Sequence, residues 1–475
     1  MHFTLIESIQ FTYLIYAVAI SSSYLFLAVM SYFEMRKYMR KNSFVDYRQI
    51  LSSPMSPSIS LIAPAYNEGL TIVDNVKSLL SLEYNNYNVI IVNDGSKDDS
   101  IQRMIDAFKL VPVNYFLERS LDHKPIKGIY KSKNQAFRKL IVIDKENGGK
   151  ADALNAGISV SKSELVACVD VDCIIQPDAL LKMVKPYLEE RDKVVAVGGV
   201  VRIANSCVIE EGRLIKVNLP ENFIARFQVM EYMRAFLLGR MAWSRLNGLM
   251  LISGAFGMFK REVVMSVGGY SLTTVGEDME LVVRMRRKLI ERKKKAKVIY
   301  IPDPLCWTEA PSDRKVLGRQ RNRWMRGTIE TLLTHRKLFF NPRYGLLGML
   351  SYPYWFFFEF LAPWVELTGL IFFGYLTYTG RVNWEYSMVL ISFIYLFSVF
   401  ISSLTLLAEE ISFYKYTRRK DFYNMLFIAI LEPIFFHPSV VYWSIRGNFD
   451  ELKGNKSWGD MSRKGFIKTS SKTDS

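Results

Sequence analysis

Long apolar runs without charged residues lie at both ends of the chain and frame a mixed middle section. The first run covers residues 8–33 and is followed at once by Arg36, Lys37, Arg40 and Lys41. At about 1.5 Å per residue, a helix over this run crosses a hydrocarbon core of about 30 Å. Because basic flanks stay on the cytoplasmic side, we expect the N-terminus to lie outside. A cleaved signal peptide is the alternative, but the run is too long and no small-residue cleavage site precedes the basic cluster.

Three further apolar stretches lie near the C-terminus, at residues 345–380, 386–408 and 422–445. The first contains two glutamates and two prolines, so it is either an interfacial helix followed by one span or two short spans. The third contains two prolines, a glutamate and a histidine in its middle, so it either crosses fully or bends back. The basic residues 418–420 favour an interfacial or re-entrant last segment.

The section between these apolar runs has the hydrophobic pattern of a soluble α/β domain. Short apolar runs at 59–63 and 89–92 predict buried strands, and residues 71–82 between them have helical apolar spacing. Strand, helix and strand in this order predict a βαβ unit, and therefore a parallel sheet covered by helices. In open α/β sheets, ligands bind beyond the carboxyl ends of the strands, where the polar loops 64–69 and 93–98 lie.

A third apolar run, residues 165–169, leads into Asp170-Val171-Asp172. If the strand continues, both aspartates point to one side while Val171 points to the core. Two converging carboxylates repel each other unless a cation lies between them, and a hard divalent ion such as Mg²⁺ or Mn²⁺ suits such oxygen ligands. A pair of exposed acids is the plainer alternative for this motif.

Residues 147–150, Asn-Gly-Gly-Lys, precede a predicted helix over residues 151–157. Two glycines before a helix N-terminus let the backbone approach an anion, and Lys150 adds a positive charge. An ordinary helix-start turn is the alternative. The segment is not a Walker A loop, because Ala151 stands where a Ser or Thr would bind the metal.

Two more groups of polar residues lie further along the middle section. Residues 253–257 form a predicted loop of small residues, and Asp278 opens a predicted helix either as a cap or as a catalytic base. Gln320, Arg323 and Trp324 share one face of another predicted helix. A guanidinium suits phosphate oxygens and an indole suits a sugar ring, whereas an amphipathic helix lying on the bilayer is the alternative.

Composition excludes several classes of protein. The 475 residues are 50% apolar and 23% charged, with a formal net charge of +16, which argues against a disordered chain. Four Cys without C-x-x-C spacing exclude a disulfide scaffold, and four scattered His argue against a His-built metal site. A mean hydropathy of +0.08 in so charged a chain indicates that apolar residues are gathered into membrane segments. The basic residues 284–297 are interpreted as a solvated helix face, with attraction to anionic lipids as the alternative, and no nucleic-acid module accompanies them.

Taken together, these motifs resemble the membrane-integrated family-2 glycosyltransferases, the group of cellulose, chitin, hyaluronan and poly-N-acetylglucosamine synthases. The order, the spacing and the flanking membrane segments agree over about residues 57–380. Residues 456–459 also look like a Trp-Gly element of hyaluronan synthases, which supports a cytoplasmic tail. The matching residues are Pro64-Ala65-Tyr66-Asn67-Glu68, Asp94-Gly95-Ser96, Gly149-Lys150-Ala151, Asp170-Val171-Asp172, Glu277-Asp278 and Gln320-x-x-Arg323-Trp324.

The resemblance implies a GT-A fold, a UDP-sugar donor and a Mg²⁺ or Mn²⁺ ion. The implied reaction is an inverting transfer that extends a β-linked polysaccharide, with transfer of one sugar to a lipid or short glycan as the alternative. A membrane scaffold with an inactive transferase domain is a third hypothesis, and the presence of every expected polar residue argues against it. The implied roles are donor binding by Tyr66, Glu68, Asp94, Lys150 and Asp170, metal binding by Asp170 and Asp172, catalysis by Asp278 as general base with Glu277, and binding of the acceptor and diphosphate by Gln320, Arg323, Trp324, Ser253 and Gly254.

The resemblance also predicts a domain organisation and a location. The predicted parts are an N-terminal transmembrane anchor at 1–41, a GT-A domain at 57–335, interfacial and transmembrane helices at 336–446 and a cytoplasmic tail at 447–475. We therefore expect a multi-pass protein of the cell membrane with a cytoplasmic catalytic domain. Its expected partners are a UDP-sugar, a glycan acceptor and the lipid bilayer, without nucleic acid, and an accessory membrane or export subunit cannot be read from the sequence.

Two features depart from the family pattern. Residues 109–147 lengthen the link between two motifs, and no function is assigned to them. Asp152 places a charge where the related synthases often have a small residue, and we interpret it as a cap or a salt-bridge partner.

Overall fold

The chain divides into two compact units. A computed structural model describes residues 5–117, 120–210, 212–413, 416 and 418–454, so the predicted tail element at residues 456–459 lies outside the described residues. The helical unit consists of Met1–Met39, Glu221–Gly248 and Pro311–Met461, and the sheet unit of Arg40–Pro220, Leu249–Ala310 and Ser462–Ser475. Parts of the predicted range 57–335 thus belong to the helical unit.

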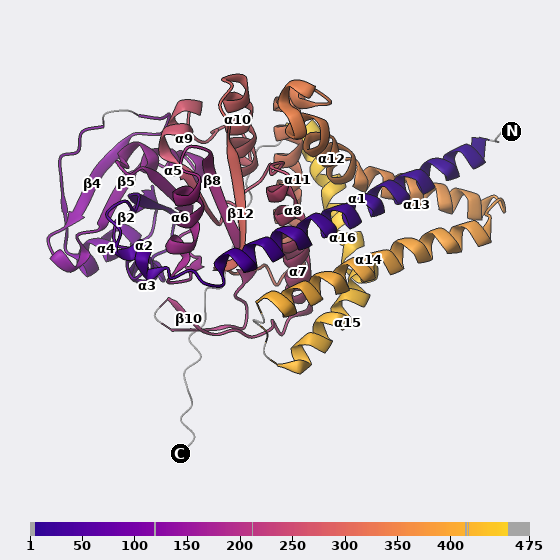
Figure 1. The fold of residues 1–475 in the computed structure, drawn as a ribbon, viewed down its shortest axis with the longest axis horizontal. Helices are drawn as coiled ribbons and strands as arrows, with labels where there is room; N and C mark the ends of the chain where they lie inside the picture. Colours follow the sequence, from indigo (N-terminus) through magenta and orange to yellow (C-terminus); the bar gives the residue numbers. More distant parts are fainter. Residues whose placement is uncertain (1–4, 118–119, 211, 414–415, 417, 455–475) are drawn as a thin grey trace, which may run out of the picture. The chain divides into compact units, whose positions relative to one another are not determined.

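The sheet unit is built on a ten-stranded sheet in the order β3-β4-β5-β2-β1-β6-β11-β8-β12-β7 (Figure 1). Its centre is parallel, as predicted, because β1 pairs in parallel with β2 and β6, and β2 pairs in parallel with β5. The strands β4 and β11 pair antiparallel with their neighbours, so the whole sheet is mixed. The strands are β1 (Ile59–Ala65), β2 (Tyr87–Asp94), β3 (Leu110–Pro112), β4 (Ile126–Ser132), β5 (Leu140–Lys145), β6 (Leu165–Val169), β7 (Ile174–Ile175), β8 (Val194–Ile203), β11 (Phe256–Lys260) and β12 (Lys297–Thr308), with β9 (Val208–Glu210) and β10 (Arg213–Lys216) in a separate hairpin.

The predicted strands and helices of the βαβ unit are all present, with small shifts at their ends. Residues 109–147, which had no assigned function, form β3, β4 and β5 and extend the sheet beyond β2. The helices of the sheet unit are α2 (Arg48–Ser52), α3 (Ile72–Leu80), α4 (Ser100–Phe108), α5 (Lys150–Val160), α6 (Ala179–Glu189), α9 (Arg261–Val267) and α10 (Glu277–Glu291), with a short 3-10 turn η1 (Gln135–Phe137).

The helix α5 lies unusually close to the sheet, and a glycine makes this approach possible. A Cβ atom at Gly157 would lie 2.4 Å from the Cγ2 atom of Ile62 on β1 and 3.3 Å from that of Val92 on β2. Every residue of α5 after Lys150 is buried. The absence of a side chain at Gly157 therefore sets the height of α5 above the sheet, and with it the position of Lys150 at the start of the helix.

The helical unit contains the apolar helices that the sequence predicts. Three of them are long and apolar enough to cross a membrane, at Leu5–Asn42, Leu347–Tyr378 and Trp384–Ser412. The stretch 345–380 thus contains one candidate span. The helices are α1 (Leu5–Asn42), α7 (Phe223–Met233), α8 (Met241–Arg245), α11 (Arg314–Thr334), α12 (Tyr352–Tyr354), α13 (Ala362–Tyr378), α14 (Trp384–Ser412), α15 (Arg419–Phe435) and α16 (His437–Leu452), with 3-10 turns η3 (Arg336–Leu338) and η4 (Pro342–Tyr344) and π-helical segments η2 (Arg234–Arg240), η5 (Leu347–Ser351) and η6 (Trp355–Phe360).

The apolar helices are held together partly by tyrosine hydroxyls, and α1, α13 and α14 extend side by side (Figure 1). Tyr16 on α1 donates a hydrogen bond to the Phe357 carbonyl at 2.8 Å, and Tyr386 on α14 donates one to the Gln10 carbonyl at 2.5 Å. Such bonds give polar groups a partner inside an apolar environment, where an unsatisfied group is costly.

The last apolar stretch is divided into two helices. α15 and α16 meet at an angle of 48°, so together they are either one broken span or a re-entrant segment. Glu432 near the end of α15 is buried and forms an ion pair with Arg234 of η2, which also donates to Ser402 Oγ on α14 at 2.6 Å. A partner from another element thus explains how a glutamate is tolerated in an apolar stretch.

Adding one methyl group at Gly157 should destabilise the sheet unit. We expect Gly157→Ala to lower the free energy of unfolding by about 1–3 kcal/mol, because the new Cβ overlaps a stiff, buried isoleucine. Thermal or denaturant unfolding of the full chain in detergent measures this. In an Ile62→Ala background the same substitution should cost clearly less, and equal costs in both backgrounds would contradict the packing argument.

Candidate active site

Predicted site residues from three separate motifs lie at the carboxyl ends of neighbouring parallel strands. Tyr66 directly follows β1, Asp94 is the last residue of β2 and Asp170 directly follows β6. Since β1 lies between β2 and β6 in the sheet, the three positions share one edge. This is the edge at which open α/β sheets bind ligands.

Asp94 is turned into the protein and holds the glycine loop that follows β5. Its Oδ1 atom accepts hydrogen bonds from Lys145 Nζ at 2.6 Å and from the backbone N–H of Gly148 at 3.0 Å. Its Oδ2 atom accepts from the backbone N–H of Gly149 at 2.7 Å and from Asn147 Nδ2 at 3.2 Å. Asp94 is buried, with 3% of the residue exposed, so it contributes to the site by fixing the backbone of residues 147–149.

Lys145 is a buried residue of this site that the sequence analysis missed. Its side chain is fully buried, and its ammonium group contacts Asp94 at 2.6 Å and Asp152 at 2.5 Å. Asp152 also accepts a hydrogen bond from the backbone N–H of Lys124 at 2.9 Å, so it acts as a salt-bridge partner, one of its two predicted roles. The signal was indirect: Lys145 is opposite Asp94 in the β2–β5 register, which no local pattern reveals.

Lys150 is held above the sheet edge by the same loop. It opens α5 directly after Gly149, whose φ of 90° is a conformation that favours glycine. Its ammonium group forms an ion pair with Asp170 and donates to the Gly254 carbonyl at 3.1 Å. Burial alone lowers the pKa of Lys150, but the charges of Asp170, Glu277 and Asp278 outweigh it, so the pKa lies above its ordinary value. Lys150 therefore carries its positive charge at neutral pH.

Asp278 faces the same turn from the start of α10. Its Oδ2 atom accepts a hydrogen bond from the backbone N–H of Gly254 at 2.9 Å. A Cβ atom at Gly254 would lie 3.2 Å from both that oxygen and Lys150 Nζ, so a glycine suits this close approach. The predicted loop 253–257 is shorter than expected, because β11 already begins at Phe256. Ser253 precedes the turn, and the neighbouring Glu277 is buried.

Asp170 and Asp172 converge as predicted, but the predicted cause, a strand that continues through both residues, is wrong. β6 ends at Val169, and the two aspartates lie in a turn in which the Cys173 N–H donates to the Asp170 carbonyl at 3.0 Å. A turn therefore brings the side chains together, where a continuing strand was expected. One ligand atom each of Asp170, Asp172 and Cys173 lie within 4.8 Å of one another, and Val171 is buried as predicted.

The loops after β1 and β2 are joined to each other by hydrogen bonds. The Asn67 N–H donates to Ser96 Oγ at 3.0 Å, and the Glu68 N–H donates to Ser100 Oγ at 3.0 Å. Tyr66 remains 45% exposed, so its ring is accessible to a planar ligand. The side chain of Glu68 accepts a hydrogen bond from Thr71 Oγ1 at 3.3 Å, at the start of α3.

Gln320, Arg323 and Trp324 share α11 in the helical unit, as the spacing predicted. Trp324 is 41% exposed, and the guanidinium of Arg321 lies 4.1 Å from its ring centroid. Arg321, which the sequence analysis did not select, is buried and pairs with Glu231 of α7 at 2.6 Å. A fixed arginine against one face of the indole restricts its orientation. The spacing of residues 321 and 324 on one helix face was the available signal.

Comparison with known proteins gives two family matches. Residues 60–267 match the model described as Glycosyl transferase family 2, and residues 165–437 match the model described as Glycosyl transferase family group 2. Two curated relatives are named poly-beta-1,6-N-acetyl-D-glucosamine synthase, one from Staphylococcus epidermidis with 31% identity over 276 residues and one from Staphylococcus aureus strain COL with 29% identity over 277 residues. Each alignment covers 58% of this chain and 55% of the relative, so the chain spans about half the length of the curated relatives it matches.

A solved structure has a similar fold. It is a mannosyltransferase from Pyrobaculum calidifontis in complex with GDP-Man and Mn²⁺, with a TM-score of 0.52 and 15% identity. The match covers 92% of this chain and 100% of that one. At this identity the likeness concerns the fold, and it agrees with the expected GT-A architecture.

Replacing the buried lysine should destabilise the protein strongly. Lys145→Met leaves Asp94 and Asp152 buried without their counter-charge, and breaking a buried pair typically costs about 3–5 kcal/mol. Unfolding of the full chain in detergent should show this loss. Adding Asp152→Asn should recover part of it, since one uncompensated charge is removed. A Lys145→Met variant as stable as the exposed control Lys133→Met would contradict this account.

Proposed function

Because the chain belongs to the glycosyl transferase family group 2, whose model matches more than half of its residues, we propose that it is a membrane glycosyltransferase that extends a β-linked polysaccharide from a UDP-sugar. The observation that carries the proposal is the connected group of Lys150, Asp170, Gly254 and Asp278 at the carboxyl edge of the sheet. The names of the staphylococcal relatives make UDP-N-acetylglucosamine the first donor to test.

In the proposed complex, the donor lies across the ends of β2, β1 and β6. Lys150 faces the diphosphate. Asp94 positions Lys150 indirectly, because its carboxylate holds the N–H groups of the glycine loop that precedes this lysine. Tyr66 offers an exposed ring for the uracil, and Glu68 orders the same loop. A cation at a helix N-terminus, held in place by a fixed glycine loop, suits a diphosphate.

The residues at the end of β6 fit a divalent metal ion. Asp170 and Asp172 offer carboxylate oxygens, the ligands that Mg²⁺ and Mn²⁺ prefer. Cys173 is buried, and its hydrogen bond with Cys306 together with burial raises the pKa of its thiol, so it suits such an ion poorly. The two aspartates would therefore hold the metal, which supplies charge neutralisation for a leaving diphosphate when bound.

The proposed reaction is a single displacement that inverts the anomeric carbon. The Asp278 carboxylate takes the proton of the acceptor hydroxyl, and the hydroxyl oxygen forms a bond to the anomeric carbon. The bond from that carbon to the diphosphate breaks at the same time, and UDP leaves with the electron pair. Lys150 stabilises the charge that develops on the diphosphate. An α-linked UDP-sugar thus gives a β-linked product.

The helical unit provides the proposed acceptor-binding groups. Trp324 offers an indole face for a sugar ring, and the Arg321–Glu231 pair holds that face in place. Arg323 and Gln320 supply a guanidinium and an amide on the same helix. The Oε1 atom of Gln320 is buried and has no hydrogen-bond partner among the described residues, which suits it to accept a bond from a ligand.

The proposed topology places the sheet unit in the cytoplasm. The basic residues after the first span and residues 418–420 favour this side of the membrane. α16 packs along α11, which supports an interfacial or re-entrant last segment. UDP-sugars would then be used on the side of the membrane where they are made.

The catalytic role of Asp278 can be tested with an isosteric change. We expect Asp278→Asn to lower the rate of UDP release by about 10²–10⁴-fold, because the amide cannot accept the proton. UDP binding by calorimetry should be nearly unchanged. Glu291→Gln at the far end of α10 serves as the control, and near-normal turnover of Asp278→Asn would refute the role.

Metal binding can be measured apart from activity. We expect Asp172→Asn to weaken Mn²⁺ binding about tenfold or more, or about 1.4 kcal/mol, because one of two carboxylates is lost. Electron paramagnetic resonance of free Mn²⁺ during a titration with the protein gives the affinity. Asp178→Asn, a solvent-exposed change nearby, is the matched control. Equal Mn²⁺ affinity in both variants would argue against this metal site.

The length of the product separates polymer extension from transfer of a single sugar. Purified protein is incubated with radiolabelled UDP-N-acetylglucosamine, and the products are sized. Chains of many residues support extension, and a product with one added sugar supports the alternative. Release of UDP without either product would mean that the protein only hydrolyses the UDP-sugar, and it would overturn both hypotheses.

A further inference from the structure

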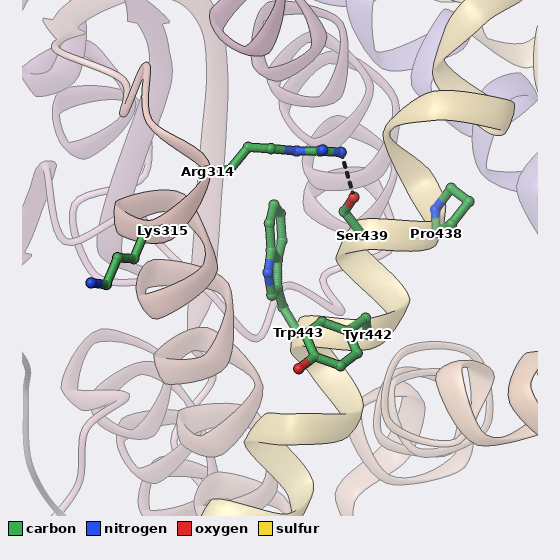
Figure 2. A pocket seen from close by; sticks show the side chains of 6 residues that line it. All are labelled: Arg314, Lys315, Pro438, Ser439, Tyr442 and Trp443. Atoms are coloured by element: carbon green, nitrogen blue, oxygen red, sulfur yellow. Dashed lines mark hydrogen bonds between the residues drawn. The ribbon is translucent and has the colours of Figure 1, made fainter.

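A pocket of the helical unit is lined by none of the residues assigned above. Its volume is about 480 Å³, which is within the range of small-molecule sites. It opens between the first turns of α11 and α16 (Figure 2). The lining residues are Arg314, Lys315, Pro438, Ser439, Tyr442 and Trp443.

The pocket exists because α11 and α16 run parallel and begin at the same end. Arg314 contacts Ser439 at 3.0 Å at the start of both helices. Further along, the indole of Trp443 packs on Gly318, where a Cβ atom would lie 2.7 Å from its Nε1 atom. Asn322 then contacts Asp450 at 2.7 Å. Gly318 lets the indole sit between the helices and form the floor of the pocket.

The lining is cationic and aromatic and contains no carboxylate. Figure 2 shows Arg314 reaching across the gap toward Ser439, with Trp443 and Tyr442 projecting from α16. Within the part of the chain that the structure describes, neither Arg314 nor Lys315 forms an ion pair. The nearest acid in sequence, Asp313, accepts hydrogen bonds from the N–H groups of Lys315 and Val316 as the cap of α11. Arg314 thus offers its guanidinium to an anionic ligand in the gap, while Figure 2 shows the ammonium group of Lys315 directed away from Arg314 at the margin of the lining.

The pocket borders an apolar span. His437, which precedes Pro438 in the lining, contacts Glu366 at 2.8 Å, and Glu366 lies in the first turns of α13. Trp364 of α13 also packs on Phe449 of α16, with ring centroids 5.5 Å apart. Both Trp364 and Glu366 lie within the candidate span Leu347–Tyr378, so the pocket is next to a segment that is apolar enough to cross a membrane.

From this geometry we propose that the pocket binds the phosphate-bearing headgroup of an anionic phospholipid. Arg314 pairs with the phosphate oxygens, Lys315 adds a positive charge at the margin of the pocket, and Trp443 and Tyr442 cover the glycerol and the first methylene groups. A free phosphate has the same charge but would gain nothing from the aromatic side chains, which is why a lipid is the favoured source. The proposal does not depend on the transferase chemistry.

The test measures lipid retention by the full chain. Protein is purified in detergent with phosphatidylglycerol or phosphatidylcholine added, and native mass spectrometry counts the lipids that stay bound. We expect one phosphatidylglycerol to be retained in preference to phosphatidylcholine. Arg314→Gln with Lys315→Gln should weaken its retention at least about fivefold, and Trp443→Phe should weaken it less.

The controls separate this site from general attraction to charge. Lys127→Gln with Lys133→Gln removes the same charge from the edge of the sheet unit and should leave retention unchanged. Thermal melting must be similar for all variants. Equal losses in both double variants, unchanged retention in the pocket variant, or displacement of the lipid by millimolar inorganic phosphate would each overturn the proposal.

Discussion

The sheet unit depends on bringing several carboxylates to one edge of a parallel sheet and holding them there against their mutual repulsion. Lys145 is fully buried between Asp94 and Asp152, and Lys150 pairs with Asp170. Asp172 and Asp278 add further negative charge beside them. The two lysines face more than two acids, and this excess of negative charge is the basis for the proposed metal ion.

One chain of contacts connects the buried part of this network with the proposed base. Asp94 holds the backbone of Gly148 and Gly149, that loop ends in Lys150, and Lys150 and Asp278 both bind Gly254. A change at the fully buried Lys145 is therefore expected to reach the reacting groups through the backbone. The two lysines differ in position: Lys145 is fully buried and helps fix the loop, whereas Lys150 keeps part of its side chain exposed at the edge of the sheet.

Much of this arrangement could be predicted from the sequence, because its elements are local. The strands before residues 66, 94 and 170 are short apolar runs that end in polar loops, and the family resemblance was confirmed by the family models. The edge strands β3 to β5 and the role of Lys145 could not be predicted, since they depend on the pairing of β2 with a strand far along the chain. The turn at Asp170 was missed because a strand and a turn can both place side chains two residues apart on one side. The roles of the individual site residues stay predictions.

The helical unit shows the same limit of local patterns. The apolar runs predicted the apolar helices. The sequence did not show how Glu432 is tolerated in the last apolar stretch, because its ion-pair partner, Arg234, comes from a distant segment. The Arg321–Glu231 pair beside Trp324 likewise joins α11 to α7 across a long sequence separation. Charged residues in apolar surroundings are thus placed by tertiary contacts that a single sequence does not reveal.

The most direct test of the central claim is an experimental structure of the full chain with Mn²⁺ and an unhydrolysed UDP-sugar. The account predicts that the diphosphate lies against Lys150 and a metal ion held by Asp170 and Asp172, with the Asp278 carboxylate facing the anomeric carbon. A nucleotide bound away from the ends of β1, β2 and β6, or an Asp278 turned away from the sugar, would contradict it.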